Sequence, residues 1–200
     1  ALLGAAPQTG IVVDMTETFT RHAGLAYWEK IRMDVWFEDR TDRLLAVLGH
    51  ETAHVYLDRE SDSRLCDHFR FTRFFHEGVA SYAEYHLFRS PEELDKLWSV
   101  AAVMRARRQV DFTELVDNDR LQARCDPNLA YPLGEMFVEA LVQCHGQAAI
   151  GKVTRAFVRH NAPQDLTGPA LWRDVFQACG FSLERVQTEF YAKLDEQVAR

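Results

Sequence analysis

The chain lacks an excess of positive charge and a long apolar run, and each absence excludes a class of protein. Its 200 residues carry 23 Lys and Arg against 30 Asp and Glu, which gives a formal net charge of −7. A nucleic-acid binder needs a basic face that neutralises phosphates, so we expect no nucleic-acid partner. No apolar run reaches the roughly 20 residues that span a bilayer, so we expect no transmembrane segment.

Cysteine is also scarce, and no two cysteines form a C-x-x-C pair. The four cysteines are far apart in the sequence: Cys66, Cys125, Cys144 and Cys179. We expect free thiols, with one disulfide as the alternative, and this pattern leaves the compartment open. The first residue is Ala rather than Met, and the opening ALLGAAP has no basic leader. We therefore interpret the start as a processed or excised end, not an intact signal peptide. The oligomeric state also stays open.

The composition is typical of a packed globular core, with 47% hydrophobic, 26% charged and 12% aromatic residues. There is no internal repeat and no shift in composition, so we predict a single domain over residues 1–200. Alternating apolar residues between positions 11 and 38 predict strands. From Thr41 onward the apolar spacing is helical. The fold class predicted is α+β, with a small sheet within about residues 1–40 and mostly helices over 41–200.

Capping residues mark several helix boundaries. The first helix is expected to begin at Thr41 or Asp42. The polar stretch 58–70 is expected to form a loop before a helix from about Arg73 to Phe88. Ser90 is a good N-cap because Glu93 follows three residues later, and this helix should end near Arg108. A loop is expected around residues 116–127. The remaining predicted helices cover residues 132–145, 147–160, 168–179 and a last segment that Ser182 opens.

The sequence His50-Glu51-Thr52-Ala53-His54 is an H-E-x-x-H motif. On a helix, residues four apart share one face, so the two imidazoles can bind one Zn²⁺ while the carboxylate between them reaches the bound water. A solvated helix face with two spare histidines is the alternative.

A catalytic zinc needs a third protein ligand. In the H-E-x-x-H-x-x-G-x-x-H arrangement that ligand follows a glycine turn, but here Leu57 stands at the glycine position and Glu60 at the third histidine. Without a turn Glu60 lies about 240° around the helix from His54, so we reject it. Glu77 is the better candidate, because small residues follow it (Gly78, Ala80 and Ser81) and allow its helix to pack closely on the first.

HETAH followed by HEGVASYAEY resembles the gluzincin (peptidase MA-like) metallopeptidases, the group of thermolysin and the aminopeptidase N family. The later segment AYPLGEMFVEALVQCHG resembles that group's Y-x-x-G helix, and the resemblance extends from about residue 24 to the end. It implies a zincin-type catalytic domain with one Zn²⁺ per chain. By the same match, His50, His54 and Glu77 are the zinc ligands and Glu51 is the general base. Tyr131 falls on the tyrosine that stabilises the transition state.

Some positions depart from the aminopeptidase pattern. The interval between His54 and Glu77 is four residues longer, and bacterial collagenases are a further group with a similar motif. The G-A-M-E-N strand is absent; its nearest counterpart begins Gly24-Leu25-Ala26 and ends at Glu29. These three residues are candidates to pair with an extended substrate backbone. His76 replaces the usual Asn, and its role stays open.

The resemblance implies hydrolysis of peptide or protein substrates, and we expect an endopeptidase. An aminopeptidase of the same group is one alternative, and a zinc-binding module without catalysis is the other. Zinc held by two imidazoles and a carboxylate keeps a position for water and lowers the pKa of that water to about 7. Glu51 would accept the proton, and Tyr131 would donate to the oxyanion. Asp58 and Glu84 are candidates to orient the ligating histidines.

Overall fold

A computed structural model describes residues 10–17, 24–27, 30–34, 41–108, 111–124, 127–159 and 168–200. Within them lie three strands: β1 (Val12–Glu17), β2 (Gly24–Tyr27) and β3 (Lys30–Asp34). The strand order is β1-β3-β2, with β1 parallel and β2 antiparallel to β3. The pairing of Leu25 with Arg32 and of Ala26 with Ile31 fixes the register between β2 and β3.

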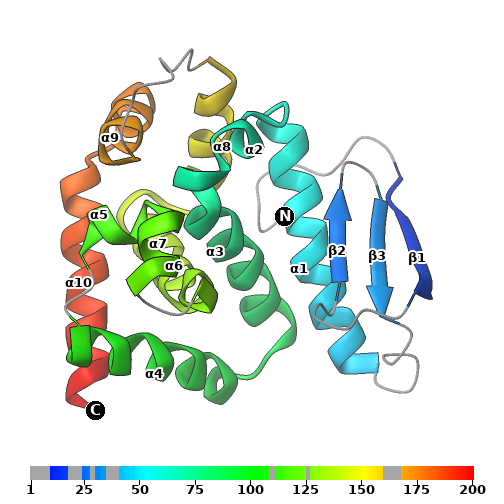
Figure 1. Cartoon of the computed structure of the whole chain (residues 1–200), viewed down its shortest axis with the longest axis horizontal. Coiled ribbons are helices and arrows are strands. Elements are labelled where there is room, and N and C mark those ends of the chain that lie inside the picture. The colour runs from blue at the N-terminus through cyan, green and yellow to red at the C-terminus, as the bar shows by residue number, and fades with distance from the viewer. Residues whose placement is uncertain are drawn as a thin grey trace.

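The rest of the described chain is mainly helical (Figure 1). The longer helices are α1 (Thr41–Glu60), α3 (Phe69–Phe88), α4 (Pro91–Arg108), α7 (Ala130–His145), α8 (Ala149–Arg159), α9 (Gly168–Ala178) and α10 (Leu183–Ala199). The short ones are α2 (Arg64–Asp67), α5 (Phe112–Leu115), α6 (Asn118–Arg124) and the 3₁₀ turn η2 (Pro127–Leu129). The predicted α+β class is confirmed. Among the described helices, none has the length and apolarity needed to cross a membrane.

Helix α1 lies between the sheet and the helical part, with β2 as the nearest strand (Figure 1). One face of α1 contributes Val47 and Val55 to a small core with Ile31 and Met33 of β3. Its other side packs on α3, which in turn packs on α7. All residues of this small core are apolar, so the hydrophobic effect of burying their side chains holds the sheet on α1.

The larger core is built from aromatic rings. Phe74 lies 5.2 Å from Phe137 and 5.0 Å from Trp172, measured between ring centroids. Both pairs are edge-to-face, the arrangement that ring quadrupoles favour. Trp172 is fully buried, and its indole nitrogen donates to the carbonyl of Phe71 at 2.7 Å. This core fixes the first half of α3 against α7 and α9.

Most predicted boundaries agree with the structure to within three residues. Ser90 and Glu93 form the reciprocal capping box, with Glu93 N–H donating to Ser90 Oγ at 3.3 Å and Ser90 N–H to Glu93 Oε2 at 3.0 Å. Ser182 caps α10 by accepting from Arg185 N–H. Gly146 and Gly180 have φ of 77° and 69°, the left-handed backbone that ends helices.

Two predicted loops were wrong. The stretch 58–70 contains the end of α1, the short α2 and the start of α3, because Asp62 and Ser63 adopt φ of 51° and 60° and make a tight turn that needs no glycine. The expected loop at 116–127 contains α6, which Asp117 caps by accepting from the backbone N–H of Asp119 and Arg120. Short polar helices of this kind have little apolar periodicity, so their spacing gives no signal.

Small residues on α3 do allow a close helix contact, but Gly78 makes it with α7 rather than with α1. A Cβ on Gly78 would lie 2.4 Å from the backbone of Gly134, and one on Gly134 would lie 2.0 Å from the carbonyl of Phe74. No side chain fits at either position. Helix α3 does pack on α1, as predicted, but Gly78 makes its close contact with α7 instead.

Candidate metal centre

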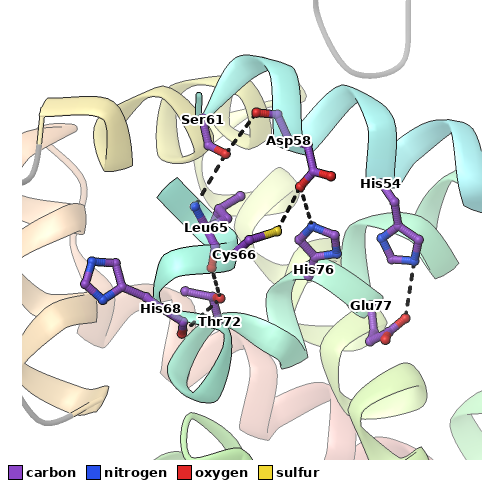
Figure 2. Close-up of polar contacts among 9 residues, drawn as sticks. All are labelled: His54, Asp58, Ser61, Leu65, Cys66, His68, Thr72, His76 and Glu77. Carbon is purple, nitrogen blue, oxygen red and sulfur yellow. Dashed lines mark hydrogen bonds and ion pairs between the residues drawn. The ribbon is translucent and has the colours of Figure 1, made fainter. Parts of the chain in front are cut away.

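His50 and His54 project from the same face of α1, as the four-residue spacing predicts. Their ring centroids are 4.9 Å apart, with the rings edge to face. The Nε2 atoms of both rings point to one oxygen of Glu77 on the neighbouring α3: Oε2 lies 3.6 Å from His50 Nε2 and 3.5 Å from His54 Nε2. Figure 2 shows the second of these pairs. The structure thus brings together the three side chains that the sequence nominated as ligands.

The spacing of these atoms suits a shared cation. Three ligand atoms at about 2.0 Å around a tetrahedral Zn²⁺ lie about 3.3 Å from one another. The two measured N···O distances exceed that value by a few tenths of an ångström, and both are too long for a hydrogen bond of ordinary length. Glu77 Oε2 is buried without a hydrogen-bond donor. A buried carboxylate oxygen normally has such a donor, so this atom fits a site that a cation completes.

Charge is distributed unevenly over the cluster. Burial by itself lowers the pKa of His50, but contacts with Glu77 and Glu84 outweigh it and raise the pKa to about 9. Burial and the neighbouring His76 lower the pKa of His54 to about 4. Burial opposes ionisation of Glu77, yet the two histidines hold the pKa of its carboxyl well below the ordinary value. Glu77 is therefore ionised at neutral pH and is ready to bind a cation.

Of the two carboxylates expected to orient the histidines, Glu84 does so. Its Oε2 lies 3.1 Å from His50 Nδ1, and its Oε1 accepts from Arg89 at 3.0 and 2.8 Å. This leaves Nε2 of His50 for the cluster. Asp58 does not contact a ligating histidine: its Oδ1 lies 3.3 Å from His76 Nε2. The expectation for Asp58 was wrong: from its position one turn beyond His54 on α1, its side chain reaches His76 of α3, the residue before Glu77.

Glu51 is buried between α1 and β2. A Cβ on Gly24 would lie 2.8 Å from its Cγ and Oε1, so the strand runs directly over this side chain. Its carboxylate accepts from the backbone of Ala26. Burial raises the pKa of Glu51 to about 7, against opposing effects from His50 and the Ala26 bond. A carboxyl that titrates near neutral pH is suited to take up and return a proton.

Tyr131 lies in the first turn of α7 and packs over His50, with ring centroids 5.8 Å apart and nearly parallel. Burial and the nearby Glu77 raise the pKa of its hydroxyl to about 12, against the effect of Arg73, which hydrogen-bonds to it. The phenol therefore remains a hydrogen-bond donor throughout the physiological range. Arg73 also lies 3.7 Å from Glu77 Oε1.

A cleft of about 510 Å³ opens on this cluster. Its walls include Gly24, His50, Glu51, Glu84 and Tyr131, and the other lining residues are Arg43, Val47, Ser81, Tyr85, Arg89, Leu97, Val100, Asn128, Leu129 and Pro132. Leu25 and Ala26, the other strand residues expected to meet substrate, are half-buried and do not line it. The Ala26 backbone instead bonds Glu51, so that part of the strand positions the carboxylate.

Two further candidates can be placed. Glu60, rejected as a ligand, lies away from the cluster and pairs with Arg155 at 2.6 Å. Glu29, the last residue of the nearest counterpart of the G-A-M-E-N strand, lies outside the described residues, as does Cys125. Cys66, Cys144 and Cys179 are free thiols. The sequence analysis missed Arg73, although its position one turn before Glu77 was a usable signal.

Comparisons with protein family models, with characterised proteins and with solved structures gave no match. The function must therefore be inferred from the site itself. The site combines two imidazole nitrogens and one buried carboxylate oxygen. Beside them is a cleft whose walls include His50, the phenol of Tyr131 and Glu51, the carboxyl with a pKa of about 7.

Proposed function

We propose that the protein is a zinc-dependent metallopeptidase with a thermolysin-like zincin domain, that it acts as an endopeptidase, and that it uses Glu51 as general base. The observation that carries this proposal is that Nε2 of His50 and Nε2 of His54 both face Glu77 Oε2, a buried oxygen without a hydrogen-bond donor. The carboxyl of Glu51 lies nearby, at the wall of the cleft. Two histidines and a glutamate are the ligand set of several catalytic zinc sites.

A zinc ion bound here would supply a Lewis acid that polarises a peptide carbonyl and lowers the pKa of water. Side chains of the protein provide proton transfer, stabilisation of the oxyanion and orientation of the histidine ring. Glu51 takes a proton from the attacking water and returns it to the leaving amine, a role that its pKa of about 7 allows in both directions. Tyr131 donates a hydrogen bond to the developing oxyanion. Glu84 keeps the His50 ring in the orientation that directs Nε2 into the cluster.

The acidic residues of the cleft favour internal cleavage over aminopeptidase action. An aminopeptidase needs a carboxylate that binds the free amine of the substrate. In the described part of the cleft the carboxylates are Glu51 and Glu84, and both are engaged: Glu51 by Ala26, and Glu84 by His50 and Arg89. Arg43 and Arg89 also line these walls, and Arg89 is engaged by Glu84 and Glu93.

The experiment is digestion of a mixed peptide library by the zinc-loaded protein, with the cut sites identified. Internal cuts support the proposal, and stepwise loss of amino-terminal residues supports an aminopeptidase. E51Q should keep the zinc and lower hydrolysis at least about 100-fold, the usual minimum for a general base. Full turnover by E51Q would exclude the mechanism. Zinc-loaded protein that cuts no peptide would indicate a binding module instead.

A further inference from the structure

A second group of ligand-type side chains lies on the far side of His54 (Figure 2). Asp58 comes from the last turns of α1, His76 from α3, and Cys66 from the short α2. Each side chain offers one donor atom, and the three atoms all lie within 4.8 Å of one another. The three side chains come from three different helices, so their proximity results from the tertiary fold and not from spacing along one helix.

The turn after α1 is what delivers Cys66. The left-handed Asp62 and Ser63 reverse the chain, and Ser63 N–H donates to the carbonyl of Asp58 at 2.7 Å. The start of α2 is held by Ser61, whose Oγ accepts from Leu65 N–H at 3.5 Å. Thr72 of α3 donates its hydroxyl to Leu65 carbonyl at 2.7 Å, which fixes α2 on α3. The backbone around Cys66 is therefore positioned by hydrogen bonds on both sides.

The distances suit a tetrahedral cation. Asp58 Oδ1 lies 3.1 Å from Cys66 Sγ and 3.3 Å from His76 Nε2. With bonds of about 2.3 Å to sulfur and 2.0 Å to nitrogen and oxygen, a tetrahedral Zn²⁺ spaces these pairs at about 3.5 Å and 3.3 Å. The N···O pair needs no adjustment and the S···O pair needs a few tenths of an ångström. His76 and Asp58 are mostly buried, whereas Cys66 is exposed and leaves a path for an ion.

We propose that Asp58, Cys66 and His76 form a second metal site, for a thiophilic divalent cation such as Zn²⁺, separate from the cluster in the cleft. A site with sulfur, nitrogen and oxygen donors selects such ions over Mg²⁺ and Ca²⁺, which prefer oxygen alone. The site would tie α2 to α1 and α3, and it assigns a role to His76.

Binding at this site must displace one proton. In the metal-free protein Cys66 is a thiol that donates to Asp58 Oδ1, with 3.1 Å between sulfur and oxygen. The cation forms a bond to sulfur, the S–H bond breaks, and the proton leaves to solvent. Affinity therefore rises with pH, because each metal ion bound releases a proton from this group.

Cobalt titration tests the site with a signal that only a thiolate ligand gives. Co²⁺ replaces Zn²⁺ in tetrahedral sites, and a Co²⁺–thiolate bond gives an intense near-ultraviolet charge-transfer band. The histidine–glutamate cluster has no sulfur ligand, so the band reports a thiolate ligand elsewhere, and the C66S variant determines whether that ligand is Cys66. We expect the band in the wild-type protein and in E77Q, and we expect its loss in C66S. C144S is the matched control, because it removes a free thiol away from the site and should keep the band.

The two proposals fail separately. A band in the wild type with no metal at the histidine–glutamate cluster would contradict the proposed function and leave the second site in place. A wild-type protein saturated with Co²⁺ that shows no charge-transfer band would overturn the second site, and so would a band that persists in C66S. Circular dichroism of C66S before the titration establishes that the variant is folded. D58N provides a second variant: it should weaken the band's apparent affinity at least about 10-fold, as loss of a metal ligand or its partner does.

Discussion

Helix α3 contributes to two groups of histidine and glutamate side chains that differ in their hydrogen bonds. Near its middle, Glu77 lies against two histidines of α1; near its end, His86 lies against Glu135 and Glu139 of α7. Either group has the spacing to hold a metal ion. Glu135, however, is fully buried with both oxygens engaged: Oε1 lies 3.2 Å from His86 Nε2, and Oε2 accepts from Trp98 Nε1. Glu77 Oε2 has no donor.

The two groups differ in whether the buried carboxylate already has hydrogen-bond donors. A buried carboxylate with two donors is stabilised as it stands, and a cation would have to displace them. The donors to Asp58 are Cys66 and His76, which can themselves bind a metal ion, whereas the indole N–H of Trp98 that donates to Glu135 cannot. A nearby cationic side chain does not distinguish the two groups, because Lys193 lies 3.9 Å from Glu139 and Arg73 lies 3.7 Å from Glu77 Oε1. A buried oxygen that faces two imidazole nitrogens without a hydrogen bond gains a partner only when a cation binds. We therefore interpret the Glu135 group as structural and the Glu77 group as a metal site.

The glutamine substitutions E77Q and E135Q test this difference directly, and E77Q should have the larger effect. E77Q removes a ligand, so we expect zinc affinity to fall at least about 100-fold, the upper range for losing even an outer partner of a ligand. Zinc should then no longer raise the melting temperature. Competition with a chromophoric chelator measures the affinity. E77Q with wild-type zinc affinity would contradict the assignment of Glu77 as a ligand.

E135Q should do the opposite. The amide presents an N–H₂ group to one of two donors, so a hydrogen bond is lost in a fully buried place at a cost of about 2 kcal/mol. Chemical denaturation without metal measures the change in the free energy of unfolding. Zinc affinity should remain within about 3-fold of wild type, less than 1 kcal/mol. A fall in zinc affinity as large as that of E77Q would show that the two regions are not distinct.

Glu84 allows a finer test within the histidine–glutamate cluster. E84Q weakens the contact that orients His50, and we expect about a 10-fold loss of zinc affinity, which corresponds to 1.4 kcal/mol. E93Q is the matched control. Glu93 also pairs with Arg89, at 3.2 Å, but its ion pair is not with His50, so E93Q changes the surroundings of Arg89 and keeps the contact between Glu84 and His50. Equal losses in both variants would place the effect on Arg89 rather than on the histidine.

The regular part of this site was predictable because helix geometry fixes it. His50 and His54 share a face by their spacing alone, and Glu77 was chosen for the small residues after it. Their side chains converge as expected, although Gly78 contacts α7. Glu84, named as a candidate to orient a histidine, does contact His50 Nδ1; its position seven residues after Glu77 is two helical turns along α3, which puts both on one face.

The irregular part could not be predicted in this way. Cys66 reaches Asp58 only because Asp62 and Ser63 take left-handed backbone angles, which residues other than glycine rarely adopt. The same turn explains why the stretch around it was taken for a loop. Asp58 was given the wrong partner because the sequence does not show which residue of α3 lies beside the end of α1; that residue is His76.

The smallest expected effect is a pH dependence at the end of α3. Burial lowers the pKa of His86, but Glu135 outweighs it and raises the pKa above the ordinary value. A histidine with a raised folded-state pKa adds stability that is fully present below its unfolded pKa of about 6.5 and is lost as pH rises through the folded value. Burial raises the pKa of Glu135 as well, so its titration also favours the folded state at lower pH.

The wild-type protein should therefore lose part of its free energy of unfolding between pH 6 and pH 9, and E135Q should lose less over the same interval. Subtracting the two profiles removes the contributions of every other titrating group that the variants share. An NMR titration should place the His86 pKa above 6.5 in the wild type and closer to 6.5 in E135Q, in metal-free protein. If the two pKa values coincide, the Glu135 group does not stabilise α3 through His86, and the contrast with Glu77 must then depend on Trp98 alone.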